Sequence, residues 1–347
     1  MPRKSKRELA TLATMPGAMP LTLADVALRA GVSTMTASRA LNRPELVSQP
    51  TRDKILEAVR AMGYVPNLLA GSLASSKSRL VAILLPTIAH SLFATTVQAI
   101  MDGLTDAGYH ALLGPTGYSP EKEQTLLETI LGRRPDGIVL TGSLHTAASR
   151  ARLANAGVPL VEAWDLSDRP LDMQVGFSHE AVGVALARHY TAKGYRDFAV
   201  ITADDPRGHR RCKALASELA AHGIARVPVQ VMPLPASWQA GRQGLRALLA
   251  QGVPPRLVVC SSDTIALGVM AEAASQGLAI PRQLAVVGFG DLSEASQAYP
   301  SLSSVSVNAA QMGTQVASAL LGRLREPSCN WGLVVDTGFV IRDREST

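Results

Sequence analysis

Side chains that could bind a small polar molecule follow several apolar runs of this sequence. Arg207 and Arg211 come after the run at 197–202, and such a pair can hold a carboxylate or phosphate through parallel hydrogen bonds. Hydroxyls, carboxylates and aromatic rings follow other runs and suit a polyhydroxylated ligand. These further candidates are Ser91, Phe93, Thr141, Trp164, Asp165, Ser262, Asp263 and Asp291.

Each candidate also has a structural interpretation. Trp164 could belong to the core, Asp165 could cap a helix, and Arg211 could form a surface ion pair. Their shared position favours a ligand site, because open α/β sheets bind ligands at the carboxyl ends of their strands.

Signatures of catalysis and metal binding are missing from the sequence. We find no G-x-S-x-G, no H-E-x-x-H and no G-x-x-x-x-G-K-[ST], and the seven histidines lack metal-ligand spacing. We therefore expect neither an enzyme nor a bound metal or cofactor. Cys212, Cys260 and Cys329 lie far apart, which predicts reduced packing residues in a cytoplasmic protein.

The stretch Thr22–Asn42 predicts two short helices joined by a tight turn. Thr22 with Asp25 resembles a capping box, Gly31 ends the first helix, and Ser33 can cap the second. Ala37 and Leu41 would then face the core. A helical hairpin in a small core is the plain alternative to a DNA-binding helix-turn-helix, whose second helix enters the major groove.

Charge separates the two interpretations. Residues 1–79 contain 12 Lys and Arg against 5 Asp and Glu, whereas the rest contains 22 against 23. The net charge of +6 is therefore concentrated around the helix-turn-helix, which favours DNA as partner.

The chain of 347 residues is long enough for two or three compact units. We predict a disordered basic arm (1–20), a helix-turn-helix domain closed by a third helix (21–63), a short helix and linker (64–79), and a ligand-binding and dimerisation domain (80–345). Residues 1–20 lack an apolar core long enough for a signal peptide, and no apolar run of about 18 residues exists. We expect a cytoplasmic chain without a membrane span.

From residue 80 onward, apolar runs alternate with helical patterns. The predicted strands are 80–85, 110–114, 137–141, 160–163, 197–202, 226–231, 257–261 and 284–289. Such alternation predicts parallel sheets covered by helices on both faces. The pattern is duplicated, with two sets of about four strands, and the run at 333–341 could return between the two halves.

The string from Thr22 to Asn42, TLADVALRAGVSTMTASRALN, resembles the headpiece of the lactose-repressor (LacI/GalR) family, with Ala37 as a mild departure. The resemblance covers 21–345 and implies an all-α headpiece and a two-lobed, periplasmic-binding-protein-like α/β domain with three crossings. Lobe 1 would span about 80–177 and 306–336, and lobe 2 about 178–305 and 337–345. The segment 64–79 would contain the hinge helix, which orders only on operator DNA, and the linker.

The resemblance also implies site residues. Leu73 would wedge between base pairs, beside Asn67 and Ala70, in the minor groove. Phosphate contacts are expected from Ser33, Thr36, Ser38 and Asn42, and base contacts from Thr34, Met35 and Arg39, with Thr22 nearby. Arg211 matches the effector-contacting arginine of the family, and Leu92, Phe93, Thr141, Asp165 and Phe177 match further pocket positions. Gly290 replaces the sugar-binding aspartate of many members, which argues against a lactose-like ligand.

Several strings, among them Pro-Thr-Ile-Ala-His-Ser-Leu-Phe and Leu-Gly-Arg-Arg-Pro-Asp-Gly-Ile-Val-Leu-Thr-Gly, resemble the gluconate-utilisation repressor branch. The implied function is a homodimeric repressor of a palindromic operator, with gluconate or a related aldonate or ketogluconate as inducer. A different sugar as effector, co-repression and a tetramer remain alternatives. So do a solute-binding protein, which the helix-turn-helix opposes, and a sugar-acid enzyme.

Overall fold

A small apolar core of Val26, Ala40, Ile55, Ala58 and Met62 holds together the first of two units, Met1–Ser78. The second unit is Arg79–Thr347. The computed structural model describes residues 21–65, 77–142, 145–252, 255–329 and 331–347. The predicted basic arm and most of the predicted hinge, including Asn67, Ala70 and Leu73, lie outside the described residues.

The first unit contains α2 (Leu23–Ala30), α3 (Thr34–Asn42), the short 3₁₀ helix η1 (Pro44–Leu46) and α4 (Gln49–Met62). The backbone N–H and the hydroxyl of Thr22 both donate to the Asp25 carboxylate, and Gly31 ends α2 in the left-handed conformation (φ 71°). The two short helices and the tight turn predicted for Thr22–Asn42 are thus confirmed. Ala37 is buried as predicted, but Ala40 takes the second core position expected for Leu41, which is only half-buried.

Two six-stranded sheets form the second unit. The first has the order β11-β5-β4-β3-β1-β2 and is parallel throughout, and the second has the order β12-β10-β9-β8-β6-β7, with only β12 antiparallel to its neighbour. We call the part built on the first sheet lobe 1 and the part built on the second lobe 2. Strands such as Leu-Val-Ala-Ile-Leu-Leu in β1 are apolar on both faces because helices cover both faces.

The strands of lobe 1 are β1 (Leu80–Leu85), β2 (His110–Pro115), β3 (Gly137–Thr141), β4 (Leu160–Ala163), β5 (Met173–Gly176) and β11 (Val334–Asp336). Those of lobe 2 are β6 (Phe198–Ala203), β7 (Val229–Met232), β8 (Leu257–Cys260), β9 (Ala285–Gly290), β10 (Ser303–Ser306) and β12 (Val340–Arg342). The sequence did not predict β5 or β10, and the strand expected at 226–231 is shorter and begins at Val229.

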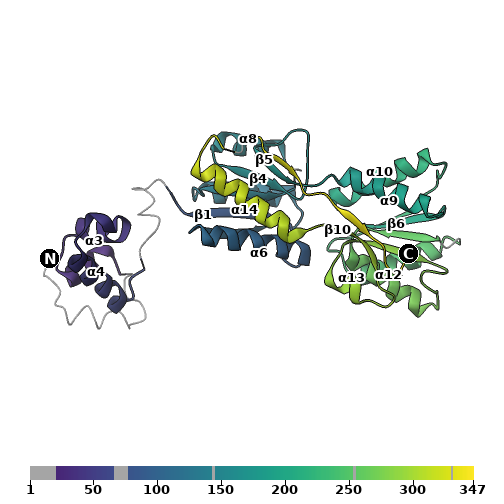
Figure 1. The fold of residues 1–347 in the computed structure, drawn as a ribbon, viewed down its shortest axis with the longest axis horizontal. Coiled ribbons are helices and arrows are strands. Elements are labelled where there is room, and N and C mark those ends of the chain that lie inside the picture. The colour runs from purple at the N-terminus through teal and green to yellow at the C-terminus, as the bar shows by residue number, and fades with distance from the viewer. Residues whose placement is uncertain (1–20, 66–76, 143–144, 253–254, 330) are drawn as a thin grey trace. The chain divides into compact units, whose positions relative to one another are not determined.

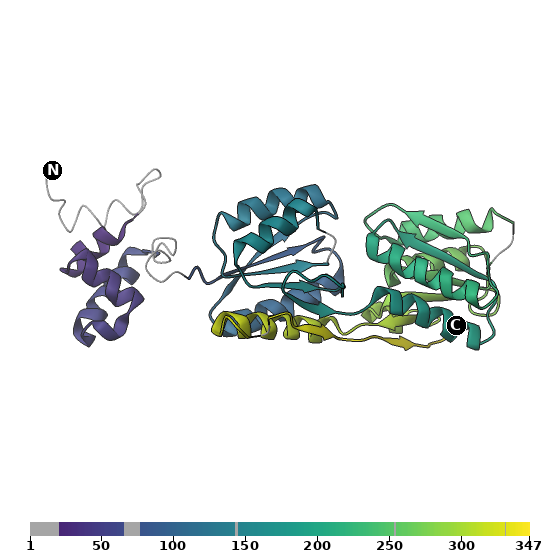
Figure 2. The same ribbon diagram turned by 90° about the horizontal axis from the view of Figure 1, so that it is seen from above.

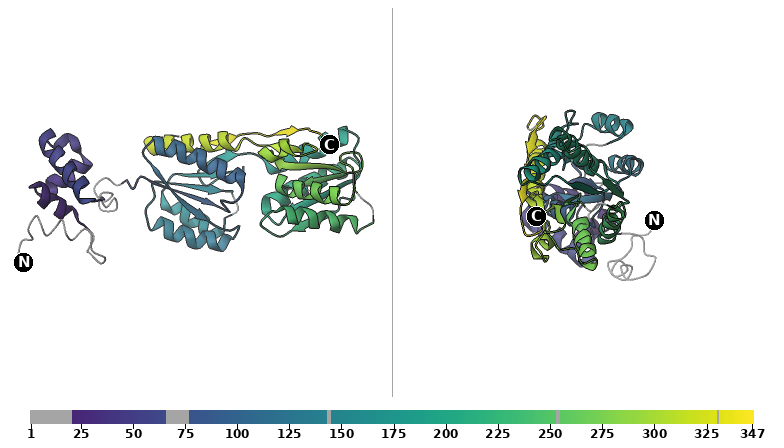
Figure 3. Two further views of the ribbon diagram at one scale, coloured as in Figure 1. Left: turned by 90° about the horizontal axis from the view of Figure 1, so that it is seen from below. Right: turned by 90° about the vertical axis from the view of Figure 1, so that its right-hand side faces the viewer.

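In lobe 1, α6 (Ser91–Asp106) and α14 (Ala309–Arg325) cover one face of the sheet, and α7 (Pro120–Leu131) and α8 (Ala147–Ala156) cover the other. In lobe 2, the helix pair α9 (His179–Ala192) and α10 (Pro206–Ala221) covers one face, and α11 (Trp238–Leu249) and α12 (Asp263–Ser275) cover the other (Figures 2 and 3). The short α13 (Ser293–Gln297) follows β9.

Three segments pass between the lobes: the links from β5 to α9, from β10 to α14 and from β11 to β12 (Figure 1). No helix of the described part of the chain is both long and apolar enough to cross a membrane.

Gly183 allows α9 and α10 to pack closely. A Cβ at this position would lie 2.3 Å from the carbonyl oxygen of Arg211 and 2.8 Å from the backbone nitrogen of Leu215. We therefore expect Gly183→Ala to force the two helices apart and to lower the free energy of unfolding by about 1–3 kcal/mol, measured by urea denaturation.

Gly132→Ala is the matched control. Gly132 is exposed, has ordinary helical φ and ψ, and its added Cβ would make only van der Waals contacts at 3.5 Å. Equal denaturation midpoints for the two variants would show that the α9–α10 contact tolerates a methyl group.

Candidate functional site

Helix α3 exposes both polar and apolar side chains and contains no acidic residue. The Ser33 hydroxyl caps the helix by accepting the backbone N–H of Thr36 (3.1 Å). Thr34, Arg39 and Asn42 are exposed, and the Met35 side chain is 64% exposed. Hydroxyl, guanidinium, amide and thioether groups on one helix can contact phosphates and base edges together.

Some predicted DNA contacts already have partners within the headpiece. The hydroxyls of Ser33 and Thr36 lie 2.8 Å apart, and the Asn42 amide donates to the Ser38 carbonyl (3.0 Å). The Thr22 hydroxyl is bound to Asp25. Arg39 has no such bond among the described residues, so its exposed guanidinium can bind an external partner.

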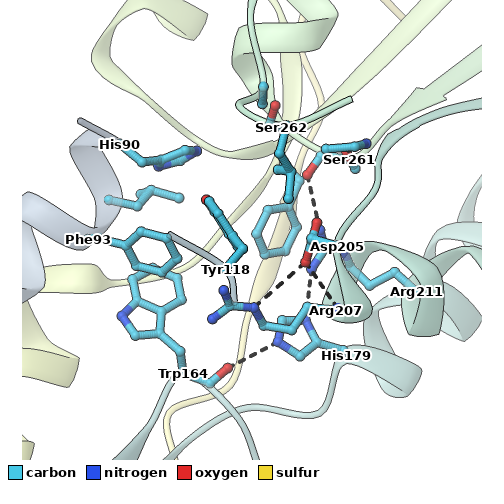
Figure 4. Close-up of a pocket in the computed structure, with 15 residues that line it drawn as sticks. His90, Phe93, Tyr118, Trp164, His179, Asp205, Arg207, Arg211, Ser261 and Ser262 are labelled. Carbon is cyan, nitrogen blue, oxygen red and sulfur yellow. Dashed lines mark hydrogen bonds and ion pairs between the residues drawn. The ribbon is translucent and has the colours of Figure 1, made fainter. Parts of the chain in front are cut away.

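In the second unit, a cavity partly open to solvent lies between the carboxyl ends of the strands of the two sheets (Figure 4). Residues that follow β1, β2 and β4 line one side, and residues that follow β6 and β8 line the other. The lining consists of His90, Leu92, Phe93, Tyr118, Trp164, His179, Ala203, Asp205, Arg207, Arg211, Leu234, Ala236, Ser261, Ser262 and Phe289.

Arg211 is a buried cation held by neutral groups. Its Nη1 donates to Nδ1 of His179 (2.8 Å), its Nη2 donates to the carbonyl oxygen of Ser261 (3.0 Å), and its guanidinium carbon lies 4.0 Å from the centre of the Phe289 ring. Burial lowers its pKa to about 10, so the side chain is charged near neutral pH. No carboxylate of the described residues pairs with it directly.

Arg207 reaches across the cavity from lobe 2 towards lobe 1. Its guanidinium lies 5.1 Å from the centre of the Phe93 ring, and its Nη1 is buried without a hydrogen-bond partner among the described residues. Asp205 lies 3.8 Å from Nε of Arg207, but its carboxylate accepts the backbone N–H groups of Arg207 and Gly208 as the cap of α10. Two guanidiniums therefore lie near the start of α10 on this side of the cavity, and guanidinium groups are well suited to bind an anion.

Aromatic rings form the opposite wall. Trp164 contacts Phe93 edge-on at 5.2 Å between ring centres, and Phe177 supports Trp164 from the core at 6.2 Å (Figure 4 labels Trp164 and Phe93). His90 packs on Phe93 at 5.5 Å, and burial followed by the charge of Arg207 lowers its pKa. The wall is therefore mostly aromatic, and the lowered pKa of His90 favours its neutral form.

A second cavity adjoins the first, and Arg207 and Tyr118 line both. Thr141 and Asp165 line the second cavity rather than the first. The Asp165 carboxylate forms an ion pair with Arg210, which also lies 3.6 Å from Glu180. The negative charge of the Asp165 carboxylate is therefore already balanced by Arg210.

Three predicted residues lie away from both cavities. Ser91 and Asp291 line a groove beside the lobe crossings, where Asp291 forms an ion pair with Arg344 (2.6 Å). The buried Asp263 carboxylate accepts the Ser304 hydroxyl (2.6 Å) and the Leu292 N–H (2.7 Å), so it braces strand ends of lobe 2. The structure thus brings together Leu92, Phe93, Trp164, Arg207, Arg211 and Ser262, with Phe177 directly behind Trp164.

The structure adds lining residues that sequence reasoning missed: Tyr118, His179, Asp205, Ser261 and Phe289. Tyr118 follows β2 and Asp205 follows β6, so the strand-end criterion applied to every strand would have found both. His179 lies three residues beyond β5, a strand the sequence did not predict. Phe289 lies within a strand, where no local signal distinguishes it from the core.

Gly290 shows why an aspartate is not accommodated at that position. Its φ is +125°, and an added Cβ would lie 2.8 Å from Cδ1 of Leu92. Leu92 therefore fills the space that a longer side chain would need. Within the described residues, no group of three or more His, Cys, Asp or Glu could hold a metal ion.

Comparisons with known proteins agree with this geometry. A model of the lacI family of bacterial regulatory proteins matches residues 22–67, and a periplasmic binding protein-like domain matches 187–347. The HTH-type transcriptional regulator GntR of Pseudomonas aeruginosa is 35% identical over 94% of this chain and 95% of its own length. GntR of Escherichia coli K12 is 34% identical over 92% and 96%.

Solved structures show the same fold. A LacI-family transcriptional regulator from Silicibacter pomeroyi superposes with a TM-score of 0.88 at 30% identity, covering 94% of this chain and 99% of that one. The lac repressor dimer bound to operator and an anti-inducer gives 0.81 at 25% identity, covering 95% and 99%. The predicted fold class, a helix-turn-helix headpiece with a two-lobed α/β domain, is confirmed.

Asp263 makes a pH-dependent contribution to stability. Burial raises its pKa from 3.8 to about 6, so the folded state binds the proton more tightly than the unfolded state. The stabilisation from protonated Asp263 is complete below the pKa that its carboxyl has in the unfolded chain. It is lost as pH rises through the pKa of about 6 in the folded protein. Between about pH 4 and pH 7, we expect the free energy of unfolding of the wild type to fall relative to Asp263→Asn by on the order of 3 kcal/mol.

Urea denaturation of both proteins across this pH range measures the difference. The Asn variant has its own constant offset, because its amide has one acceptor oxygen where the carboxylate accepts both the Ser304 hydroxyl and the Leu292 N–H. If the difference between the two free energies of unfolding stays constant with pH, the pKa of Asp263 is not raised.

Proposed function

Because the chain belongs to the LacI family of bacterial regulatory proteins, and is thus a DNA-binding transcriptional regulator, we propose that it is a repressor controlled by a small sugar acid. The proposed effector is gluconate or a related aldonate or ketogluconate. It would act as inducer, by binding between the lobes and weakening the hold of the headpieces on operator DNA.

The observation that carries the effector assignment is the buried guanidinium of Arg211. It donates only to the neutral His179 and to the Ser261 carbonyl, so its charge lacks a direct carboxylate partner among the described residues. An entering carboxylate would supply that partner, together with the unpaired Nη1 of Arg207.

The rest of the ligand is assigned from the other walls. The faces of Phe93 and Trp164 suit its carbon chain, and the hydroxyl of Ser262, with Tyr118, suits its alcohols. Thr141 and Asp165 in the adjoining cavity extend these contacts to the far end of a polyol. The identity to GntR regulators and the shared sequence strings support an aldonate over other sugars.

For DNA binding, we propose that Arg39, Thr34 and Met35 contact base edges and that Ser33, Thr36, Ser38 and Asn42 contact phosphates. A homodimer reading a palindromic operator follows from the two-fold match between protein and site, as in the structural relative that is a dimer bound to operator.

Arg211→Ala should abolish the response to the effector while operator affinity stays close to wild type, since Arg211 belongs to the unit that lacks the headpiece. Arg211→Lys keeps the charge but loses the planar guanidinium that can donate two parallel hydrogen bonds. Gluconate should therefore bind about tenfold or more weakly. Calorimetry with gluconate, 2-ketogluconate and 6-phosphogluconate, with and without an operator selected from random DNA, measures both effects and the sign of the response.

Arg188→Ala is the control, because Arg188 is exposed on α9 and pairs with Glu218 away from the cavity. Tighter operator binding with gluconate would establish co-repression instead of induction. Loss of operator binding in the Arg211 variants would assign Arg211 a purely structural role.

Arg39→Ala should weaken binding to the selected operator by roughly 10- to 100-fold, because one bidentate base contact is worth about 1–3 kcal/mol. Binding to a scrambled duplex should change much less. Fluorescence anisotropy at several salt concentrations gives both affinities.

Arg60→Ala provides the comparison, since Arg60 lies on α4 and donates to the Leu56 carbonyl. If Arg39→Ala weakens binding to both duplexes equally, Arg39 contacts phosphate and the proposed base contact is wrong.

A further inference from the structure

His179 connects Arg211 to the opposite lobe. One ring nitrogen, Nδ1, lies 2.8 Å from Nη1 of Arg211 in lobe 2. The other, Nε2, lies 3.0 Å from the carbonyl oxygen of Trp164 in lobe 1. Figure 4 shows the ring next to the Trp164 carbonyl, with a dashed line marking their hydrogen bond.

These two partners determine the protonation state of the ring. A guanidinium can only donate and a carbonyl oxygen can only accept. Nδ1 must therefore carry the lone pair and Nε2 the hydrogen, so that His179 is neutral with the proton on Nε2. Protonation of Nδ1 would set an N–H against the N–H of Arg211 and break the contact.

The surroundings agree with a neutral ring. Burial lowers the pKa of His179 well below its ordinary value, and the charges of Arg211, Arg207 and Arg210 on α10 lower it further. The Trp164 carbonyl acts in the opposite direction. Asp205 and Asp165 are the carboxylates near this arginine cluster, and both are engaged, the first as the cap of α10 and the second with Arg210.

The Trp164 carbonyl is itself held in an unusual geometry. Trp164 has a φ of 72°, in the left-handed region that non-glycine residues rarely adopt, and its N–H donates to the Val175 carbonyl (3.1 Å). Gly176 permits this turn, because an added Cβ would lie 2.4 Å from the Asp165 nitrogen. The carbonyl is thereby aimed at His179, whose ring also packs on Phe177 at 4.7 Å.

We infer that His179 is a positioning residue for effector binding. It orients the guanidinium of Arg211 towards the cavity and connects that guanidinium, through its own ring, to the backbone of Trp164 in lobe 1. The inference rests on the proposed function, because it assigns the site to an anionic effector. A ligand that pulls on Arg211 would act through His179 on the aromatic wall, so both sides of the cavity respond together.

Three substitutions test the two bonds separately. His179→Gln keeps one acceptor and one donor at the end of a side chain of similar size, so we expect gluconate affinity within about threefold of wild type. His179→Asn can accept from Arg211 but is too short to reach Trp164. His179→Leu can do neither and should bind gluconate at least about tenfold more weakly.

Calorimetry on the full chain gives the affinities, and circular dichroism shows whether each variant is folded. The control is His189→Gln and His189→Leu, on the same helix, where His189 pairs with Asp343 instead. The inference is supported if Gln rescues the loss seen in Leu at position 179 and neither change matters at 189. If His179→Leu does not fold, the other two variants are compared. Weaker gluconate binding by His179→Asn than by His179→Gln supports the inference, and equal gluconate affinities overturn it.

Failure of the proposed function has a different signature, because the wild type itself would then bind no aldonate. In that case nitrogen NMR of histidine-labelled protein decides the arrangement of the ring, with the His179 signals assigned from the Gln variant. A neutral ring protonated on Nε2 at about pH 6 supports the Arg211–His179–Trp164 connection. A charged ring, or a proton on Nδ1, overturns it.

Discussion

A buried positive charge without a direct carboxylate partner is the constraint on which the effector domain depends. Placing an arginine in a low-dielectric site is costly unless its charge is compensated. Here the compensation is partial. The His179 lone pair, the Ser261 carbonyl and the Phe289 ring contact the guanidinium, and the carboxylates of Asp205 and Asp165 act on its charge without a direct bond. Under the proposed function, an anion that enters the cavity would complete this compensation and would thereby couple ligand binding to the lobe interface.

The fold puts that charge where it can be used. Parallel strands direct all their carboxyl ends to one edge of each sheet, and the three crossings connect the two sheets so that both edges border one cavity. Lobe 1 contributes aromatic faces and lobe 2 contributes arginines. Because each lobe supplies only half of the site, a ligand that contacts both halves changes the free energy of their separation, which is the quantity a regulator must control.

Much of this arrangement could be predicted from the sequence. The capping pattern and Gly31 gave the helix-turn-helix, and the apolar runs gave the parallel sheets. Position at a strand end placed Trp164, Arg207 and Arg211 in the cavity. The same criterion did not place Asp263 and Asp291, because their partners, Ser304 and Arg344, are 41 and 53 residues away along the chain. His179 was missed because it follows β5, a strand that the sequence did not predict.

A crystal structure of the full chain with gluconate would test the central claim most directly. The account predicts the carboxylate within hydrogen-bond distance of Arg211 and Arg207, with the carbon chain against Phe93 and Trp164. A carboxylate bound elsewhere, with Arg211 still held only by His179 and Ser261, would contradict it.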